Sequence, residues 1–170
     1  EVAKTRDLPL LDSLHSQLET LAPPSSRPAG LAHGDYRFDN CVLAKDGRIA
    51  AVLDWELCTL GDPVVDFCWS LQYWAEPGEP LSFLQSPPTL NPLFPTRDYV
   101  AKLYAEKSGY SLAEQHYYFA FGWWKMACIV EGVYARLKKG ASGGMKTAPV
   151  DQVGAMVEAY LKQAQRCLQA

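Results

Sequence analysis

The sequence predicts a mostly α-helical domain of the α+β class, with one short β-hairpin. Three observations carry this prediction. Apolar residues recur at helical spacing in five segments, an Asp-Gly pair stands between two short apolar runs, and no internal repeat is visible. With 170 residues, 48% of them hydrophobic, the chain can bury the core of one compact domain.

The first three helices are predicted from their apolar faces and their end signals. Residues 8–21 place apolar side chains on one face. The second helix is expected to begin at Asp62-Pro63, an N-cap followed by proline at the first helical position, and to bury the run 64–74. Thr96 and Gly109 are the expected N-cap and stop of the third.

Two more helices are predicted in the C-terminal half of the chain. Residues 111–114 form a capping-box pattern before a long apolar segment that should reach about Leu137. A glycine-rich break at 140–144 separates it from an amphipathic helix over 150–168. The proline-rich segment 75–97 is predicted to form no regular element.

The hairpin is predicted from a turn signal. Asp46-Gly47 stands between the apolar runs 41–43 and 49–53, and these two residues tolerate the positive φ angles that a tight hairpin turn requires.

Composition and charge narrow the class of protein. The net charge is −3, from 16 basic and 19 acidic residues, which argues against a nucleic-acid-binding protein. The longest apolar segment is interrupted by Lys125, so no membrane span is expected. The five cysteines form no CxxC pair and lie in apolar stretches, which indicates buried thiols and a cytoplasmic protein.

The chemically informative segment runs from His33-Gly34 through the hairpin. Asp35 and Asn40 stand five residues apart in one polar loop, and Asp54 follows the second hairpin strand. This is the order and spacing of the protein-kinase catalytic loop and metal-binding aspartate, with Gly34 in place of an arginine. Phosphoryl transfer needs a carboxylate near the acceptor hydroxyl, a role that suits Asp35. It also needs hard oxygen ligands for Mg²⁺, which Asn40 and Asp54 can supply.

Segments 33–40, 53–56 and 61–66 together resemble the aminoglycoside phosphotransferase, or choline kinase-like, family of small-molecule kinases. Residues 125–136 resemble the branch of that family found beside or fused to acyl-CoA dehydrogenases. The resemblance implies the helical C-terminal lobe of a protein-kinase-like fold, in which a hairpin carries the catalytic and metal-binding loops. It implies ATP and Mg²⁺ as cofactors, with Asp35 as catalytic base and Asn40 and Asp54 as magnesium ligands.

The resemblance also implies a reaction and its partners. The reaction is transfer of a phosphoryl group to the hydroxyl of a small-molecule acceptor, either a hydroxyacyl thioester or other lipid-derived alcohol, or an aminoglycoside-like compound. An acyl-CoA dehydrogenase is the expected neighbouring enzyme.

One part of the family pattern is missing. No glycine-rich loop or Val-Ala-x-Lys strand precedes His33. We therefore expect residues 1–170 to be the C-terminal lobe, with the N-terminal nucleotide-binding lobe as a missing partner and the isolated lobe inactive. The chain begins without Met, and we expect it to start inside a longer protein. Two other interpretations stay open: a catalytically inactive kinase-like binding module, and a protein labelled acyl-CoA dehydrogenase by association, although no flavin-binding pattern is present.

Several further residues are candidates for the site. The expected supporting residues are His33, Arg37, Asp39, Glu56 and Asp66. His33 is expected to brace the loop rather than carry a proton, and Asp66 to reach back to backbone amides of the catalytic loop. Asp39 and Glu56 are either support for the ligands or solvated carboxylates. Most aromatic residues are expected in the core, while Trp74, Glu131 and Arg136 are candidates for binding the acceptor.

Overall fold

The structure, a computed structural model, describes residues 6–23, 27–77, 87–140 and 149–170. The chain divides into two compact units, one made of residues 1–23 and 119–170 and the other of residues 24–118.

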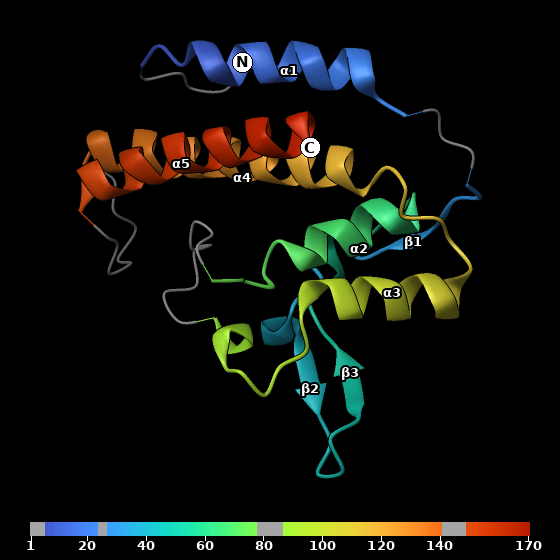
Figure 1. The fold of residues 1–170 in the computed structure, drawn as a ribbon. Helices are drawn as coiled ribbons and strands as arrows, with labels where there is room; N and C mark the ends of the chain where they lie inside the picture. The colour runs from blue at the N-terminus through green and yellow to red at the C-terminus, as the bar shows by residue number, and fades with distance from the viewer. Residues whose placement is uncertain (1–5, 24–26, 78–86, 141–148) are drawn as a thin grey trace. The chain divides into compact units, whose positions relative to one another are not determined.

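The first unit is helical (Figure 1). It contains α1 (Pro9–Leu21), α5 (Val150–Gln169) and all but the first turn of α4 (Gln115–Lys138). Helix α1 packs against α5, and the Trp123 ring of α4 lies 5.3 Å from the Tyr160 ring of α5. Burial raises the pKa of Tyr160 to about 12. Residues that carry the apolar stripes therefore form the core of this unit.

The second unit combines four short strands with two helices. Strand β1 (Gly30–Ala32) pairs antiparallel with β4 (Thr59–Gly61), and β2 (Cys41–Leu43) pairs antiparallel with β3 (Ile49–Val52). The helices are α2 (Pro63–Leu71), which contacts β1, and α3 (Arg97–Ser108). Figure 1 shows the β2–β3 hairpin extending away from these helices. Short 3-10 helices cover Phe38–Asn40, Trp55–Leu57 and Pro88–Leu90.

The core of the second unit lies on the buried face of α2. Val64 and Cys68 of α2 pack with Tyr118, and the Phe67 ring stacks on Tyr104 at 3.7 Å between centroids. Burial raises the pKa of the Cys68 thiol to about 12. The Asp62 carboxylate accepts a hydrogen bond from the Val64 amide at 2.9 Å, so α2 begins at its predicted cap.

The predicted fold class, mostly helical with a hairpin, is confirmed. The hairpin turns at Gly47, whose φ is +81°, and α3 lies between its predicted cap Thr96 and Gly109, whose φ is +72°. No helix in the described ranges has both the length and the apolar character needed to cross a membrane.

Three details differ from the sequence predictions. The pattern at 111–114 forms no capping box, because α4 begins only at Gln115, Ser111 Oγ accepts from the Ala113 amide, and Glu114 pairs with Arg27 at 3.5 Å. Strand β4 was not predicted, since its three residues carry no alternating pattern of their own. The five cysteines form no disulfide, but only Cys68 is buried as predicted, since Cys58 is exposed and Cys41, Cys128 and Cys167 are half-buried.

The predicted irregular segment 75–97 holds the 3-10 helix Pro88–Leu90. Its residues 78–86, and residues 141–144 of the predicted glycine-rich break, lie outside the described part of the chain.

Candidate active site

Helix α2 holds the start of the polar loop through one carboxylate. Asp66, in the first turn of α2, accepts a hydrogen bond from the His33 amide on Oδ2 and one from the Gly34 amide on Oδ1, both at 2.8 Å. The sequence predicts that Asp66 reaches the loop amides, and the structure has this contact. Hydrogen bonds to an ionised carboxylate are stronger than neutral ones, so Asp66 fixes the loop where it leaves β1.

Gly34 allows the loop to pass close to the segment that follows Asp54. Its φ is +83°, and a Cβ atom there would lie 2.8 Å from the Leu57 carbonyl oxygen. A side chain at this position would force the two segments apart.

Asp35 lies at the centre of the loop and is partly shielded, with its side chain 18% exposed. Its Oδ2 accepts a hydrogen bond from Asn40 Nδ2 at 3.1 Å and faces Arg37 Nε at 3.3 Å. Its Oδ1 accepts a hydrogen bond from the Tyr73 hydroxyl at 3.3 Å. The carboxylate is thus held from two sides and belongs to a side chain that solvent still reaches.

The contact of Tyr73 with Asp35 was missed from sequence, because Tyr73 was grouped with the core aromatics. A signal was nevertheless present. Asp66, Ser70 and Tyr73 follow one another at intervals of four and three residues, which places them on one helical face. Since Asp66 faces the loop, Tyr73 is directed toward it as well.

Asn40 is buried and links the loop to the hairpin. Its Nδ2 also donates to the backbone oxygen of Asp35 at 2.8 Å, and its own carbonyl accepts from the Leu53 amide at 2.8 Å. Among the described residues, the Asn40 side chain makes hydrogen bonds only through Nδ2, so its Oδ1 is available to another group.

His33 also links the loop at Asp35 to the end of the hairpin at Leu53. Its Nδ1 accepts from the Asp35 amide at 3.2 Å, and its Nε2 lies 2.9 Å from the Leu53 carbonyl oxygen. Both bonds are satisfied by the neutral tautomer with hydrogen on Nε2. The Trp55 ring packs 4.6 Å from the imidazole. This geometry favours a bracing role for His33.

Asp54 follows Leu53 directly, in the left-handed backbone region with φ +63° and ψ +56°. Among the described residues it is the one non-glycine residue with positive φ. Its side chain makes no capping bond to the 3-10 helix that it precedes, and the residue is exposed. Its carboxylate is therefore free of the local bond that an aspartate before a helix usually makes.

The donor set of this site is compatible with magnesium. Mg²⁺ is usually held by one or two protein oxygens together with waters and substrate phosphates. The Asn40 amide oxygen and the Asp54 carboxylate are two such oxygens, on segments joined by the Leu53 to Asn40 hydrogen bond. Within the described ranges no group of three or more His, Cys, Asp or Glu side chains could hold a metal by itself. A magnesium ion here would need further oxygens from phosphate or water.

The remaining predicted residues of this unit are spread around the loop. Arg37 pairs with Asp39 at 3.5 Å as well as with Asp35, and its guanidinium lies 5.4 Å from the Tyr73 ring centroid. Asp39 is mostly exposed, and so is Glu56. A supporting role for these two carboxylates stays a prediction.

Glu131 and Arg136 belong to the other compact unit. The Glu131 side chain is 2% exposed, and its carboxylate accepts hydrogen bonds from Arg6 Nε and Nη2, both at 3.1 Å. Arg136 is exposed on α4. The structure gives Glu131 an internal partner, and the role of either residue toward an acceptor stays a prediction.

A half-buried ion pair at the start of α2 was also missed from sequence. Arg27 donates from Nε and Nη2 to the Asp62 carboxylate at 2.8 to 3.0 Å and from Nη2 to the Tyr118 hydroxyl at 2.6 Å. Burial by itself raises the pKa of Asp62, but the hydrogen bonds from Arg27 and the Val64 amide outweigh it and lower that pKa overall. The same pairing raises the pKa of Arg27.

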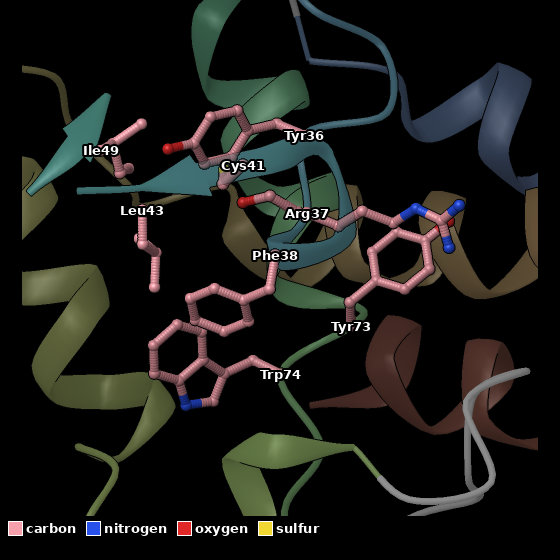
Figure 2. A pocket seen from close by; sticks show the side chains of 9 residues that line it. Tyr36, Arg37, Phe38, Cys41, Leu43, Ile49, Tyr73 and Trp74 are labelled. Carbon is pink, nitrogen blue, oxygen red and sulfur yellow. The ribbon is translucent and has the colours of Figure 1, made fainter. Parts of the chain in front are cut away.

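An apolar cavity of about 90 Å³ borders the loop (Figure 2). It is lined by Tyr36, Arg37, Phe38, Cys41, Leu43, Ile49, Ser70, Tyr73 and Trp74. The Trp74 ring packs 5.5 Å from Phe38, and its Nε1 donates to the Pro95 carbonyl at 2.9 Å. Burial and a hydrogen bond with Cys41 raise the pKa of Tyr36. Arg37 and Tyr73 belong both to this cavity and to the surroundings of Asp35.

This arrangement of loop, hairpin and helices is that of a kinase-like phosphotransferase. The model of the phosphotransferase enzyme family matches residues 1–85, half of the chain, and the chain belongs to that family. A crystal structure of a Ralstonia eutropha protein, provisionally assigned as an aminoglycoside phosphotransferase, is 27% identical with a TM-score of 0.72. The match covers 96% of this chain and 51% of that protein.

Relatives of known sequence are named after acyl-CoA dehydrogenases and not after phosphotransferases. Acyl-CoA dehydrogenase family member 11 of Gallus gallus is 32% identical over 145 residues, which is 80% of this chain and 18% of the relative. Family member 11 of Homo sapiens is 31% identical over 139 residues, again 80% and 18%. Family member 10 of Mus musculus is 31% identical over 95% of this chain and 15% of its own length. The chain thus spans less than a fifth of each of these relatives, and they fit the predicted branch.

Proposed function

We propose that the chain forms the acceptor-binding and metal-binding part of an ATP-dependent phosphotransferase that phosphorylates a small-molecule hydroxyl. The observation that carries the proposal is the hydrogen-bonded framework of Asp35, Asn40 and Leu53-Asp54. Within one compact unit it brings together the partly shielded carboxylate of Asp35 and two oxygen groups that can bind a metal, the Asn40 amide and the Asp54 carboxylate.

Asp35 is the proposed catalytic base. It would accept a hydrogen bond from the acceptor hydroxyl and take its proton while the hydroxyl oxygen bonds to the γ-phosphorus and the bond from that phosphorus to ADP breaks. The contacts from Asn40, Arg37 and Tyr73 support this role, because a base held in one orientation lowers the entropic cost of reaching the reactive geometry.

Asn40 and Asp54 are the proposed magnesium ligands. Bound Mg²⁺ would neutralise charge on the phosphates. The residues of this chain would set the position of the ion. The Nδ2 bonds of Asn40 direct the Oδ1 of Asn40 away from Asp35, and the backbone hydrogen bonds at Leu53 fix the segment that carries Asp54.

We propose that the nucleotide-binding lobe is supplied by sequence outside these 170 residues. Support comes from the solved structure, of which this chain covers only 51%. The sequence also lacks a glycine-rich loop before His33.

The proposed acceptor has an apolar part, as a hydroxyacyl thioester or another lipid-derived alcohol does. The cavity beside Asp35 is lined mainly by aromatic and aliphatic side chains, and the one charged residue among the described residues that line it is the cation Arg37. A polycationic aminoglycoside would be disfavoured by these surroundings. Of the three residues proposed from sequence for acceptor binding, Trp74 lines the cavity.

The test is ATP turnover by the protein as its gene encodes it, with any flanking sequence included. The panel contains hydroxyacyl thioesters, simple lipid-derived alcohols and an aminoglycoside, and Asp35→Asn is the control. We expect acceptor-dependent ADP release with an apolar alcohol and a loss of about 10² to 10⁴ in kcat for Asp35→Asn. Equal turnover by the variant would refute the assignment of the base.

The names of the curated relatives favour testing a second function. If these residues took part in an acyl-CoA dehydrogenase, the purified protein would show a flavin absorption spectrum. A flavin-free chain that binds Mg²⁺ and ATP but phosphorylates no alcohol would instead be a kinase-like binding module.

A further inference from the structure

The two carboxylate oxygens of Asp35 have unequal surroundings. Oδ2 accepts from Asn40 Nδ2 at 3.1 Å and faces Arg37 Nε at 3.3 Å. Oδ1 has one donor among the described residues, the Tyr73 hydroxyl at 3.3 Å. Oδ2 is thus the oxygen beside the Arg37 cation, whereas Oδ1 has a single neutral donor in the described part of the chain. Since a carboxylate oxygen can accept about two hydrogen bonds, Oδ1 has one acceptor position left.

We propose that Tyr73 is a positioning residue that directs Oδ1 of Asp35 toward the acceptor, which makes Oδ1 the oxygen that receives the acceptor's hydroxyl proton. This inference rests on the proposed function of the site. Tyr73 would act through Asp35, by fixing the rotation of the carboxylate about its Cβ–Cγ bond so that the open acceptor position of Oδ1 stays in one place.

The position of Tyr73 is itself well defined. Its amide donates to the Ser70 carbonyl at 3.2 Å in the turn that continues α2, and its ring meets the Trp69 ring edge to face at 5.8 Å. The Arg37 guanidinium covers the ring at 5.4 Å from its centroid. Three independent contacts therefore hold the hydroxyl that touches Asp35.

Helix α2 and the turn that follows it hold the loop at two points. Asp66 binds the loop's backbone at His33 and Gly34, and Tyr73, seven residues later, binds the side chain of Asp35. Tyr73 lies in the turn that follows the end of α2 at Leu71. Helix α2 and this turn together set where the carboxylate lies relative to the start of its own loop.

Tyr73 also connects the base to the cavity. Figure 2 shows its ring beside Arg37, and both residues line the cavity together with Phe38 and Trp74. An acceptor whose apolar part fills this cavity would carry its hydroxyl past Tyr73 toward Oδ1.

The experiment compares Tyr73→Phe with Tyr99→Phe in the full-length protein. Tyr73→Phe keeps the ring on which Arg37 packs and removes only the hydroxyl. Tyr99 lies on α3 with 59% of its surface exposed and serves as the matched control. For each we would measure kcat, KM for ATP, KM for the best alcohol of the panel and the thermal midpoint.

We expect Tyr73→Phe to lower kcat about tenfold, the fold-change that corresponds to the loss of one hydrogen bond to a charged group. KM for ATP and the thermal midpoint should not change, and Tyr99→Phe should behave as the parent. An unchanged kcat in Tyr73→Phe overturns the proposal. So does a parallel change of kcat, KM for ATP and midpoint, because that pattern indicates a merely structural role.

A second readout keeps this inference separate from the proposed function. With ¹³C-labelled aspartate, the Asp35 ¹³Cγ resonance at constant pH should move in Tyr73→Phe and stay in place in Tyr99→Phe. If the parent phosphorylates no alcohol, the proposed function fails and this resonance alone decides whether Tyr73 positions the carboxylate. A resonance that is the same in all three proteins overturns the inference.

Discussion

Asp54 keeps a backbone conformation that most residues avoid, at the position where the proposed metal site needs a carboxylate. Left-handed φ and ψ angles cost a non-glycine residue about 1 kcal/mol, less for aspartate and asparagine. On one side the Leu53 backbone bonds to Asn40 and His33, and on the other the Trp55 ring packs against His33. Folding thus fixes this residue through its neighbours, and its own side chain is left for another partner.

Asp54→Asn is therefore expected to separate metal binding from stability. Asparagine tolerates the left-handed region, so the thermal midpoint should stay that of the parent. The affinity for Mn²⁺, used as a paramagnetic probe for Mg²⁺ in the presence of ATP, should fall at least about tenfold. Electron paramagnetic resonance would measure free Mn²⁺, with Asp98→Asn on α3 as control. If both variants bind Mn²⁺ equally well, Asp54 is not a ligand.

At the scale of elements, three polar residues on α2 and at its two ends organise the site. Asp62 caps it and binds Arg27, Asp66 holds the loop backbone, and Tyr73 in the turn beyond it reaches Asp35. The opposite face of α2 packs Val64 and Cys68 in the core. The same short helix therefore anchors the unit and aligns the loop.

Asp66→Asn should weaken both functions of the helix. An asparagine can accept from only one of the two amides that Asp66 now binds, so we expect about 2 kcal/mol of lost stability together with reduced turnover. Urea unfolding and the ATP assay on the same protein would measure both. The bracing role is wrong if neither quantity changes.

The Arg27–Asp62 pair predicts a dependence of stability on pH. Because folding lowers the pKa of Asp62 below its ordinary value of 3.8, the contribution of the pair is complete above that pH and is lost as the pH falls through the lower folded-state pKa. The parent should thus be more stable than Asp62→Asn at pH 7, and the difference should shrink below pH 3.8. Urea titrations at constant ionic strength would show this. A difference that persists unchanged in acid would contradict the prediction.

At the scale of the whole molecule, the chain matches one half of a solved phosphotransferase and less than a fifth of its curated relatives. The described residues include the proposed base, the two proposed magnesium ligands and a cavity, all within residues 24–118. The phosphate-binding lysine and the loop that covers a nucleotide are not recognisable in the sequence.

We accordingly expect the 170-residue chain alone to show no appreciable ATP turnover and only weak binding of Mg²⁺–ATP. Binding of Mg²⁺–ATP to the chain alone and to the full-length protein would be compared by titration calorimetry, with turnover assayed in parallel. Turnover by the chain alone at the full-length rate would show that no second lobe is needed.

The elements that could be predicted from sequence are those whose determinants are local. Asp62-Pro63, Thr96 and Gly109 act within one helical turn of their own positions, and Asp46-Gly47 sets its turn directly. The spacing of Asp35, Asn40 and Asp54 is also a property of the chain itself. Strand β4 escaped prediction because it exists only through its pairing with β1, nearly thirty residues earlier.

What the sequence by itself determined is the helical class of the fold, its hairpin, the phosphotransferase family and the loop that carries Asp35. Only the tertiary structure decided which groups surround that loop: Tyr73 at Oδ1 of Asp35, Arg27 at Asp62, and the left-handed backbone of Asp54. The physical reason is the separation in sequence between the residues that interact. Caps, turns and periodic faces depend on neighbours in the chain, whereas these contacts join residues up to 38 positions apart and exist only once α2 has packed against β1.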